Sequence, residues 1–461
     1  MTNSINTALK AKFHRSFRWT LGGSIAYESC KALHCALLLH CMPTTLYGAM
    51  GSIFSIIYLV TYIADLGATN SLPPFLHLLN KSRANFRTFL FRHSFLPHAP
   101  LIVACAGAAT YLAATKFTDL PFPWLIPSLI FLETIRTFLR MLLHTTFLSK
   151  RVVLVELTIF VLYLAATWIP VLLQGGQVTL NNVFIPHFLD SIACVVAFIY
   201  LAHRYYRGLP SIALSLPTSL TKRLLSTKLF NYLLRVTRNM FTSNFLTPLF
   251  ALRFGLAPAG TFYIASMMVN GLQAVVKSAI GYSGNALLAN LKEESDQAKK
   301  HAFTAIVNKL MMIVAPVIIV IGFNVVSIIK ISKVPTLTTE MVGLGLLCLF
   351  ISFTEFFFLL YEQFYIIHEA ANKLFLFKLF ELVALYCFVQ HQMTISPITT
   401  LAGLIVIRTL SFVAIATNAW YAWQISISLK TNRRILLGSL LAAGIVAATA
   451  HYIIKTLHFG G

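Results

Sequence analysis

Charged side chains stand inside long apolar runs of this sequence, at spacings that place them on shared helix faces. In the run 18–41, Glu28, Lys31 and His34 follow one another at intervals of three and so form one stripe. A stripe this polar cannot face lipid, and an ammonium such as that of Lys31 suits a phosphate in a wet cavity. The structural alternative is a neutralised Glu28–Lys31 pair that locks the helix bundle. The sequence leaves both interpretations open.

A second polar face follows in the run 123–145, where Glu133, Arg136 and Arg140 lie on one side of a helix. A guanidinium stays charged in any environment and binds phosphate through two hydrogen bonds, which makes Arg136 a candidate contact for an anionic ligand. The alternative pairs Arg136 with Glu133 and lets Arg140 reach the cytoplasmic interface. For Arg140 the alternative is favoured because of its expected depth.

The second half of the chain adds candidate ligand contacts in two neighbouring apolar runs. Lys277 matches Lys31 in kind, and together they would make a cationic cavity for an anionic head group. Arg238 has an alternative role as an anchor at the cytoplasmic end of its helix. The four candidates of these runs are Arg238, Asn244, Gln273 and Lys277.

Acidic residues in the apolar runs are candidates for ion coupling or for the cavity wall. Glu355 and Glu362 are seven residues apart and share a helix face. A carboxylate in a low-dielectric site can carry a coupling proton. Glu381 and Arg408 instead predict a structural ion pair between neighbouring helices. The four coupling or cavity candidates are Glu28, Glu133, Glu355 and Glu362.

The composition predicts that the elements carrying these residues lie in a lipid bilayer. Of the 461 residues, 57% are hydrophobic and 11% are charged, and the mean hydropathy is +0.77. Soluble domains carry about 25% charged residues. The net charge of +22 would suggest nucleic acid in a soluble protein. Here the basic residues stand between apolar runs, which is typical of membrane topology and argues against nucleic-acid binding.

The apolar runs predict an all-α polytopic membrane protein of 12–13 transmembrane helices. With the N-terminus in the cytoplasm, 27 of the 36 Lys and Arg residues fall in cytoplasmic segments or at helix ends on that side, as the positive-inside rule requires. A basic amphipathic segment at 72–97 is expected along the interface. The candidate spans are 18–41, 44–66, 98–116, 123–145, 152–173, 183–203, 231–253, 260–285, 303–329, 341–366, 374–391, 397–424 and 435–455.

The longest polar connection, 204–230, divides the chain into two halves of six helices. A shift of 215 residues lays Pro43-Thr-Thr-Leu-Tyr47 on Pro258-Ala-Gly-Thr-Phe262, each after the first helix of a half. Such a faint repeat agrees with the two-lobe arrangement of secondary transporters. The predicted domains are 1–210 for helices one to six, 211–434 for helices seven to twelve, and 435–461 for an extra C-terminal helix.

A short turn motif follows the first helix of each half. The first half reads Leu46-Tyr47-Gly48 at this point and has Asp65-Leu66-Gly67-Ala68 after its second helix. The second half reads Arg253-Phe-Gly255-Leu-Ala-Pro258-Ala-Gly260-Thr-Phe262 after its first helix. Over roughly residues 15–430 this pattern of helices and turns resembles the multidrug/oligosaccharidyl-lipid/polysaccharide exporter superfamily, in its polysaccharide-flippase branch. The thirteenth helix departs from the twelve or fourteen that are usual in the family.

The resemblance implies two six-helix lobes around a central cavity and alternating access between the two sides of the membrane. It implies a multi-pass protein of the bacterial inner membrane that flips polyprenyl-diphosphate-linked oligosaccharides in polysaccharide biosynthesis. The expected partners are the lipid bilayer and this amphiphilic substrate, the expected state is a monomer, and no cofactor or metal is expected.

Two other functions stay open at this point. A cation-coupled multidrug exporter of the same superfamily would favour acidic and aromatic cavity residues over cationic ones. A membrane-embedded glycan polymerase or ligase would carry catalytic residues on long loops, and the external loop at 174–182 contains none. The chain also lacks a nucleotide-binding or hydrolase motif in a plausible context. We therefore predict a transporter and not an enzyme.

Overall fold

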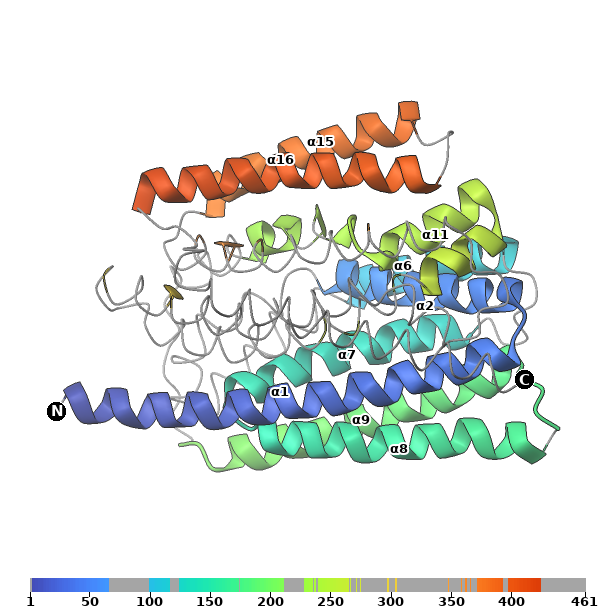
Figure 1. Cartoon of the computed structure of the whole chain (residues 1–461). Coiled ribbons are helices and arrows are strands. Elements are labelled where there is room, and N and C mark those ends of the chain that lie inside the picture. Colours follow the sequence, from blue (N-terminus) through green and yellow to red (C-terminus); the bar gives the residue numbers. More distant parts are fainter. Residues whose placement is uncertain are drawn as a thin grey trace, which may run out of the picture. The chain divides into compact units, whose positions relative to one another are not determined.

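The computed structural model describes residues 2–65, 99–116, 124–173, 175–210, 228–264 without 235 and 238, 371–392 and 397–423, with scattered residues between 266 and 365. Within these ranges every regular element is helical (Figure 1). This confirms the all-α prediction. The helices are α1 (Thr2–Cys41), α2 (Thr44–Ala64), α6 (Ala99–Lys116), α7 (Leu125–Thr145), α8 (Ser149–Leu173), α9 (Leu180–Arg207), α11 (Ser243–Phe254), α15 (Ala371–Gln392) and α16 (Pro397–Trp423).

Most predicted spans in the described ranges coincide with helices. The runs 44–66, 98–116 and 123–145 match α2, α6 and α7 to within two residues. Four helical segments are long and apolar enough to cross a bilayer, among the residues that the structure describes. The chain is thus a multi-pass membrane protein. These segments are Thr45–Ala64, Ser149–Leu173, Leu180–Arg207 and Thr400–Ala419. The predicted runs 72–97, 303–329, 341–366 and 435–455 lie largely or wholly outside the described residues.

Two helices differ from their predicted runs. α1 begins at Thr2 instead of residue 18 and has 40 residues, so it is about 60 Å long and exceeds the hydrocarbon thickness of about 30 Å. The predicted helix 231–253 is interrupted before α11. There the hydroxyl of Thr242 donates to the Asn239 carbonyl at 2.8 Å, and such a local bond competes with the helical pattern.

The chain forms two compact units, each assembled from separate segments. The first unit contains Met1–Tyr27, Ala49–Leu249 and Tyr282–Glu293, and the second contains Glu28–Gly48, Phe250–Gly281 and Glu294–Gly461. α1 therefore contributes its first part to one unit and its last part to the other. The predicted boundaries at residues 210 and 434 remain predictions.

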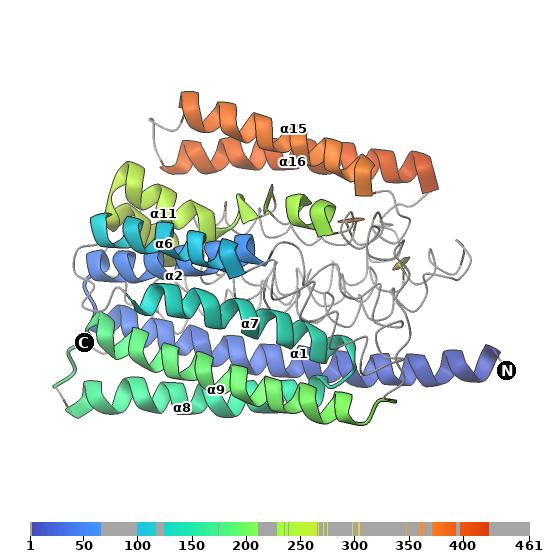
Figure 2. The ribbon, with the colours of Figure 1, turned by 180° about the vertical axis from the view of Figure 1, so that it is seen from behind.

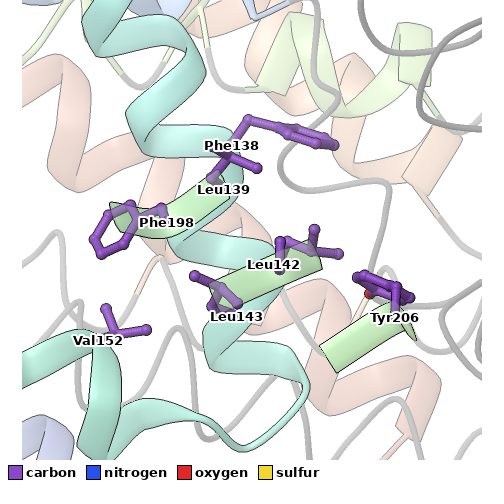
Figure 3. Close-up of a cluster of buried hydrophobic side chains, with 8 residues drawn as sticks. Phe138, Leu139, Leu142, Leu143, Val152, Phe198 and Tyr206 are labelled. Carbon is purple, nitrogen blue, oxygen red and sulfur yellow. The ribbon is translucent and has the colours of Figure 1, made fainter. Parts of the chain in front are cut away.

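In the first unit, α7 packs against α6, α8 and α9. Figure 3 shows the apolar side of this packing, where α7 side chains at 138, 139, 142 and 143 meet α8 and α9. Their spacing of three and four residues makes one stripe along α7. The cluster consists of Phe138, Leu139, Leu142, Leu143, Val152, Phe198, Ala202 and Tyr206.

Glycines end α8 in the first unit. Gly175 and Gly176 have φ angles of 76° and 85°, a left-handed conformation that glycine adopts without steric cost. The Gly176 N–H donates to the Val171 carbonyl at 2.8 Å, which caps the helix. The chain then turns back into α9, where the Thr179 N–H donates to Asn182 Oδ1 at 3.1 Å. α8 and α9 consequently run side by side.

In the second unit, α15 and α16 pack along each other as an adjacent pair, which Figure 2 shows from behind. Tyr365 bonds to α16 through its hydroxyl, which donates to Asn418 Oδ1 at 2.8 Å and lies 3.2 Å from the Ile415 carbonyl. The buried Leu374 and Leu404 belong to the apolar core of this unit.

Candidate functional site

A buried group of polar side chains joins α7 to α9 in the first unit. The Arg136 guanidinium donates from Nη1 to Glu133 Oε1 at 3.1 Å and to Asp190 Oδ2 at 2.8 Å. Ser191 Oγ also donates to Glu133 Oε1, at 2.6 Å, and His187 Nε2 lies 3.9 Å from the same oxygen. These five residues are called the acid-rich cluster below. All are buried, with Arg136 8% exposed and Asp190 5% exposed.

Aromatic rings enclose the His187 side of the acid-rich cluster. Phe54 of α2 lies edge-on to the imidazole at a centroid distance of 5.1 Å, and Tyr163 of α8 lies 6.1 Å away. Phe54 also stacks on Phe184 at 4.6 Å. The rings keep bulk water from the two carboxylates, so each charge in the cluster must be compensated within the protein.

The acid-rich cluster, as the described residues form it, contains more acids than permanent cations. Glu133 and Asp190 are acids, and Arg136 is the cation that hydrogen-bonds both of them. With His187 neutral the cluster has a surplus of one negative charge. Asp190 Oδ1 is buried and has no hydrogen-bond partner among the residues that the structure describes. A proton on one acid or on His187 would balance the charge.

Arg140 and Glu156 form a separate ion pair one turn along α7. Arg140 Nε lies 2.9 Å from Glu156 Oε1 on α8, and the Arg140 side chain is 33% exposed. The predicted Glu133–Arg136 pair is confirmed. For Arg140, the expected position at the interface fits its partial exposure, whereas the Glu156 partner was not predicted. The sequence did contain a signal for this partner, because Glu156 is a carboxylate inside the neighbouring apolar run 152–173.

The second unit holds a different ion network between α15, α16 and Glu362. Lys378 Nζ lies 3.2 Å from Glu362 Oε1 and 3.0 Å from Glu381 Oε2. Arg408 Nη1 donates to Glu381 Oε1, which confirms the predicted Glu381–Arg408 pair. Both cations also contact the Phe358 ring, whose centroid lies 4.0 Å from Lys378 Nζ and 3.8 Å from Arg408 Cζ. Glu362, Lys378, Glu381 and Arg408 are called the balanced cluster below.

Lys378 stands near the start of the predicted span 374–391. The structure places it in α15, where it is 0% exposed. Its two carboxylate partners make that burial possible. Glu362, a predicted coupling residue, is itself a member of this ion-paired network.

The α1 stripe lies in the part of α1 that belongs to the second unit. Glu28 and Lys31 are half-buried and His34 is buried. Glu28 Oε2 would lie 3.7 Å from a Cβ on Gly271, so the Glu28 carboxylate faces this glycine. The Cys35 side chain, one residue beyond His34, is buried at 7% exposure.

The two turn motifs of the sequence meet in the same unit. A Cβ on Gly48 would lie 2.2 Å from the Leu256 carbonyl oxygen and 3.0 Å from the Gly260 backbone N. The rings of Tyr47 and Tyr263 lie beside each other with centroids 5.7 Å apart. Only glycine at position 48 allows this backbone approach, which explains the Tyr-Gly turn.

The remaining predicted site residues divide between described and undescribed parts of the chain. Asn244 is half-buried in the first turn of α11, directly after the helix break. Interrupted helices often form ligand sites in transporters. Lys277, Gln273, Arg238 and Glu355 lie outside the described residues.

Comparison with solved structures identifies the fold. A MATE protein in complex with MaL6 aligns with a TM-score of 0.56 and 12% identity, over 95% of this chain and 97% of that chain. The lipid II flippase MurJ, in an inward closed conformation, aligns with a TM-score of 0.54 and 8% identity, over 98% of this chain and 99% of that chain. A MOP superfamily transporter from Pyrococcus furiosus aligns with a TM-score of 0.55 and 11% identity, over 91% of this chain and 97% of that chain. The chain has the fold of these transporters.

The neighbours belong to the superfamily that the sequence resembles, and they are transporters and a flippase, not enzymes. No protein-family model matches the sequence, and no curated protein matches it.

Sequence reasoning missed Asp190 and His187, which complete the acid-rich cluster. Both residues stand in the predicted span 183–203, and His187, Asp190 and Cys194 follow one another at intervals of three and four residues, which places them on one face of α9. An aspartate in such a run was a usable signal, because acids at bilayer depth require a partner. The partner itself, Arg136 on α7, could not be chosen without knowing which helices touch.

Proposed function

We propose that the protein moves a phosphate-bearing amphiphile, first of all a polyprenyl-diphosphate-linked oligosaccharide, across the bacterial inner membrane by alternating access. The observation that carries the proposal is the fold, which extends over more than nine tenths of this chain and of each solved transporter. One of those proteins is a lipid II flippase. The N-terminus is proposed to lie in the cytoplasm, in agreement with the distribution of basic residues.

The α1 stripe is the proposed contact for the diphosphate. Lys31 is half-buried inside α1, at a depth where a lysine needs an anionic or polar neighbour. Glu28 lies one turn away and faces the segment at Gly271, close in sequence to the candidates Gln273 and Lys277. A carboxylate near the ammonium can hold it when the ligand has left and so limit the affinity, which lets the ligand be released.

Arg238 and Asn244 are proposed as further ligand contacts, since Asn244 follows the interruption before α11. Arg136 takes a different place in the proposal. Its guanidinium is already bound by two carboxylates, so direct contact with a ligand would require that network to open. We assign Arg136 to the coupling machinery.

The acid-rich cluster is the proposed coupling site. Its surplus negative charge changes by one when Glu133, Asp190 or His187 takes up a proton. Because Arg136 bonds both carboxylates, protonation of one acid weakens one of its two ion pairs and alters the α7–α9 contact. A change in that contact is a means by which proton binding can bias one conformation of the transporter.

A cation-coupled multidrug exporter is the alternative function. The surplus acid and the aromatic rings around His187 favour it, because cationic drugs suit acidic and aromatic surroundings. A membrane-embedded glycan polymerase or ligase has no such support from the described residues. The sign of charge on the transported molecule separates the two transporters.

The test is transport by the purified full chain in proteoliposomes, with a fluorescent lipid-linked sugar diphosphate and an organic cation as separate probes. Lys31→Ala is expected to slow sugar-lipid translocation about tenfold or more, and Lys31→Arg to restore part of it, because the missing cation is a direct phosphate contact. Lys373→Ala removes an exposed lysine of α15 and serves as the matched control.

Wild-type translocation of the sugar lipid by Lys31→Ala would refute the cationic site. Transport of the organic cation alone, with loss of activity in Glu133→Gln, would establish the multidrug alternative.

A further inference from the structure

An exposed group of basic side chains lies where α1 meets the beginning of α8. Arg15 and Arg18 project from α1, and Lys150 and Arg151 are the second and third residues of α8. All four are exposed. Lys150 Nζ lies over the Trp19 ring at 5.2 Å from its centroid, which ties the two helices together at this point. These five residues are called the basic patch.

Buried hydrogen bonds fix the two halves of the basic patch against each other. Ser16 Oγ on α1 lies 2.6 Å from Ser149 Oγ, the first residue of α8, and His144 Nδ1 lies 3.0 Å from the same Ser149 oxygen. Further along the two helices, a Cβ on Gly23 would lie 2.2 Å from the nearest Val153 side-chain atom. α1 and α8 therefore pack closely along this stretch, and the exposed side chains beside the contact come from both helices.

The basic patch lies at the depth of lipid head groups. Ser149 begins one of the apolar segments that can cross the membrane, so Lys150 and Arg151 stand at its polar boundary. Trp19 is half-buried, and tryptophan prefers this interface. Further along α1 and α8 the exposed side chains become apolar: Ile25 is 48% exposed and Leu154 is 46% exposed.

The charge of the patch is uncompensated by the described part of the protein. No carboxylate there forms an ion pair with Arg15, Arg18, Lys150 or Arg151. The acid of α8 closest in sequence is Glu156, which is buried and pairs with Arg140. The start of α8 adds the positive end of a helix dipole. Four cations and a helix N-terminus at head-group depth are complementary to a phosphodiester.

We propose that the basic patch binds the phosphate of an anionic phospholipid from the surrounding leaflet. The acyl chains would follow the apolar surface at Ile25 and Leu154, and the phosphate would lie between the arginines of α1 and the first turn of α8. This lipid is distinct from the transported molecule, because Arg18 of the patch and Lys31 of the α1 stripe are 13 residues apart on one helix, about 20 Å along its axis. By bridging α1 and α8 the lipid stabilises the first unit.

The experiment measures binding of dioctanoyl phosphatidylglycerol to the full chain in detergent, by native mass spectrometry and by the thermal unfolding midpoint. Dioctanoyl phosphatidylcholine has the same acyl chains without net charge. Lys150→Gln/Arg151→Gln is expected to weaken phosphatidylglycerol binding about tenfold or more, since each cation near an anionic surface contributes measurably. Arg204→Gln/Arg207→Gln removes the same charge from the exposed end of α9 as the matched control.

The proposed site is supported if Lys150→Gln/Arg151→Gln loses phosphatidylglycerol binding while Arg204→Gln/Arg207→Gln retains it. Equal binding by wild type and patch variant overturns it, and so does equal loss in both double variants, because that result would reflect overall charge alone. Equal affinity of the wild type for the two lipids overturns it as well. If Lys150→Gln/Arg151→Gln fails to fold, Arg15→Gln/Arg18→Gln on the other helix gives the same test.

Discussion

The two buried ion networks differ in charge balance. Among the described residues, the balanced cluster has two acids and two cations, all 4% exposed or less, with the Phe358 ring close to both cations. The acid-rich cluster has two acids and one permanent cation, with His187 beside them. Each cluster joins neighbouring helices inside its own unit. Of the two clusters as the described residues form them, the acid-rich cluster is the one that becomes neutral by taking up a proton.

This difference separates a structural role from a coupling role. Removing one partner from a buried, balanced network leaves an uncompensated charge, which is strongly destabilising. Removing one acid from the acid-rich cluster leaves one acid with one cation, so it leaves no uncompensated charge and lacks this cost. The degree of burial is similar for the two clusters, so charge balance is the property that assigns their roles. Three substitutions test that assignment, in order of their expected effect on stability.

Arg408→Met is expected to have the largest effect. It leaves Glu362 and Glu381 with Lys378 as the one cation of the cluster, and breaking a buried pair in this way costs about 3–5 kcal/mol. The expected result is a large drop in the thermal unfolding midpoint of the purified protein and a lower yield from membranes. Arg207→Met, at the exposed end of α9, is the control and should unfold as wild type does.

Wild-type stability of Arg408→Met would show that the network of the second unit is not structural. A milder loss in the double variant Arg408→Met/Glu381→Gln would strengthen the assignment, because the double change removes both charges of one pair.

Lys228 tests the same charge argument outside the membrane spans. Burial lowers the pKa of Lys228 to about 8 from its ordinary 10.5, against the opposing attraction of Asp65. Between about pH 8 and pH 10.5 the folded protein has released this proton while the unfolded chain retains it, so stability rises with pH in that window. The full gain is about 3 kcal/mol. Below pH 8 the cost of the buried charge is constant.

The measurement compares the thermal unfolding midpoint of wild type and Lys228→Met across this pH window. The difference between the two proteins should shrink as the pH rises, and Lys373→Met should follow wild type throughout. A difference that stays constant with pH would show that Lys228 keeps its charge in the folded protein throughout this window, and would contradict the prediction.

The sequence predicted the elements better than the contacts between them. Apolar runs placed α2, α6 and α7 to within two residues, because membrane insertion demands long apolar helices. The break before α11 was missed, since Thr242 acts through one hydrogen bond that composition does not reveal.

Within the candidate sites, pairs on one helix or on successive helices were predicted, such as Glu133–Arg136 and Glu381–Arg408. Asp190 belongs to the same network as Arg136 but stands 54 residues away. Such a contact depends on which helices pack together, and helix packing in membranes is decided by shape and small residues rather than by charge patterns.

Asp190→Asn is expected to change the stability of the protein least of the three substitutions. It therefore gives the clearest contrast between the acid-rich cluster and the balanced cluster. The amide oxygen still accepts a hydrogen bond from Arg136, and Glu133 with Arg136 remains as a neutral pair, so the change in unfolding free energy should be within about 1 kcal/mol. Glu381→Gln is the matched change in the balanced cluster, where it removes a required acid and should cost about 3–5 kcal/mol.

A transport assay should reverse the order of these two variants: Asp190→Asn, the more stable one, is expected to lose the response to a proton gradient, and Glu381→Gln to keep it. Asp190→Asn should fold normally yet lose the acceleration that an imposed proton gradient gives the wild type in proteoliposomes, because the cluster no longer has a surplus charge for a proton to balance. A residual fraction of correctly folded Glu381→Gln should keep that acceleration. Equal destabilisation of the two variants, or a preserved gradient response in Asp190→Asn, would mean that charge balance does not separate coupling from structure in this protein.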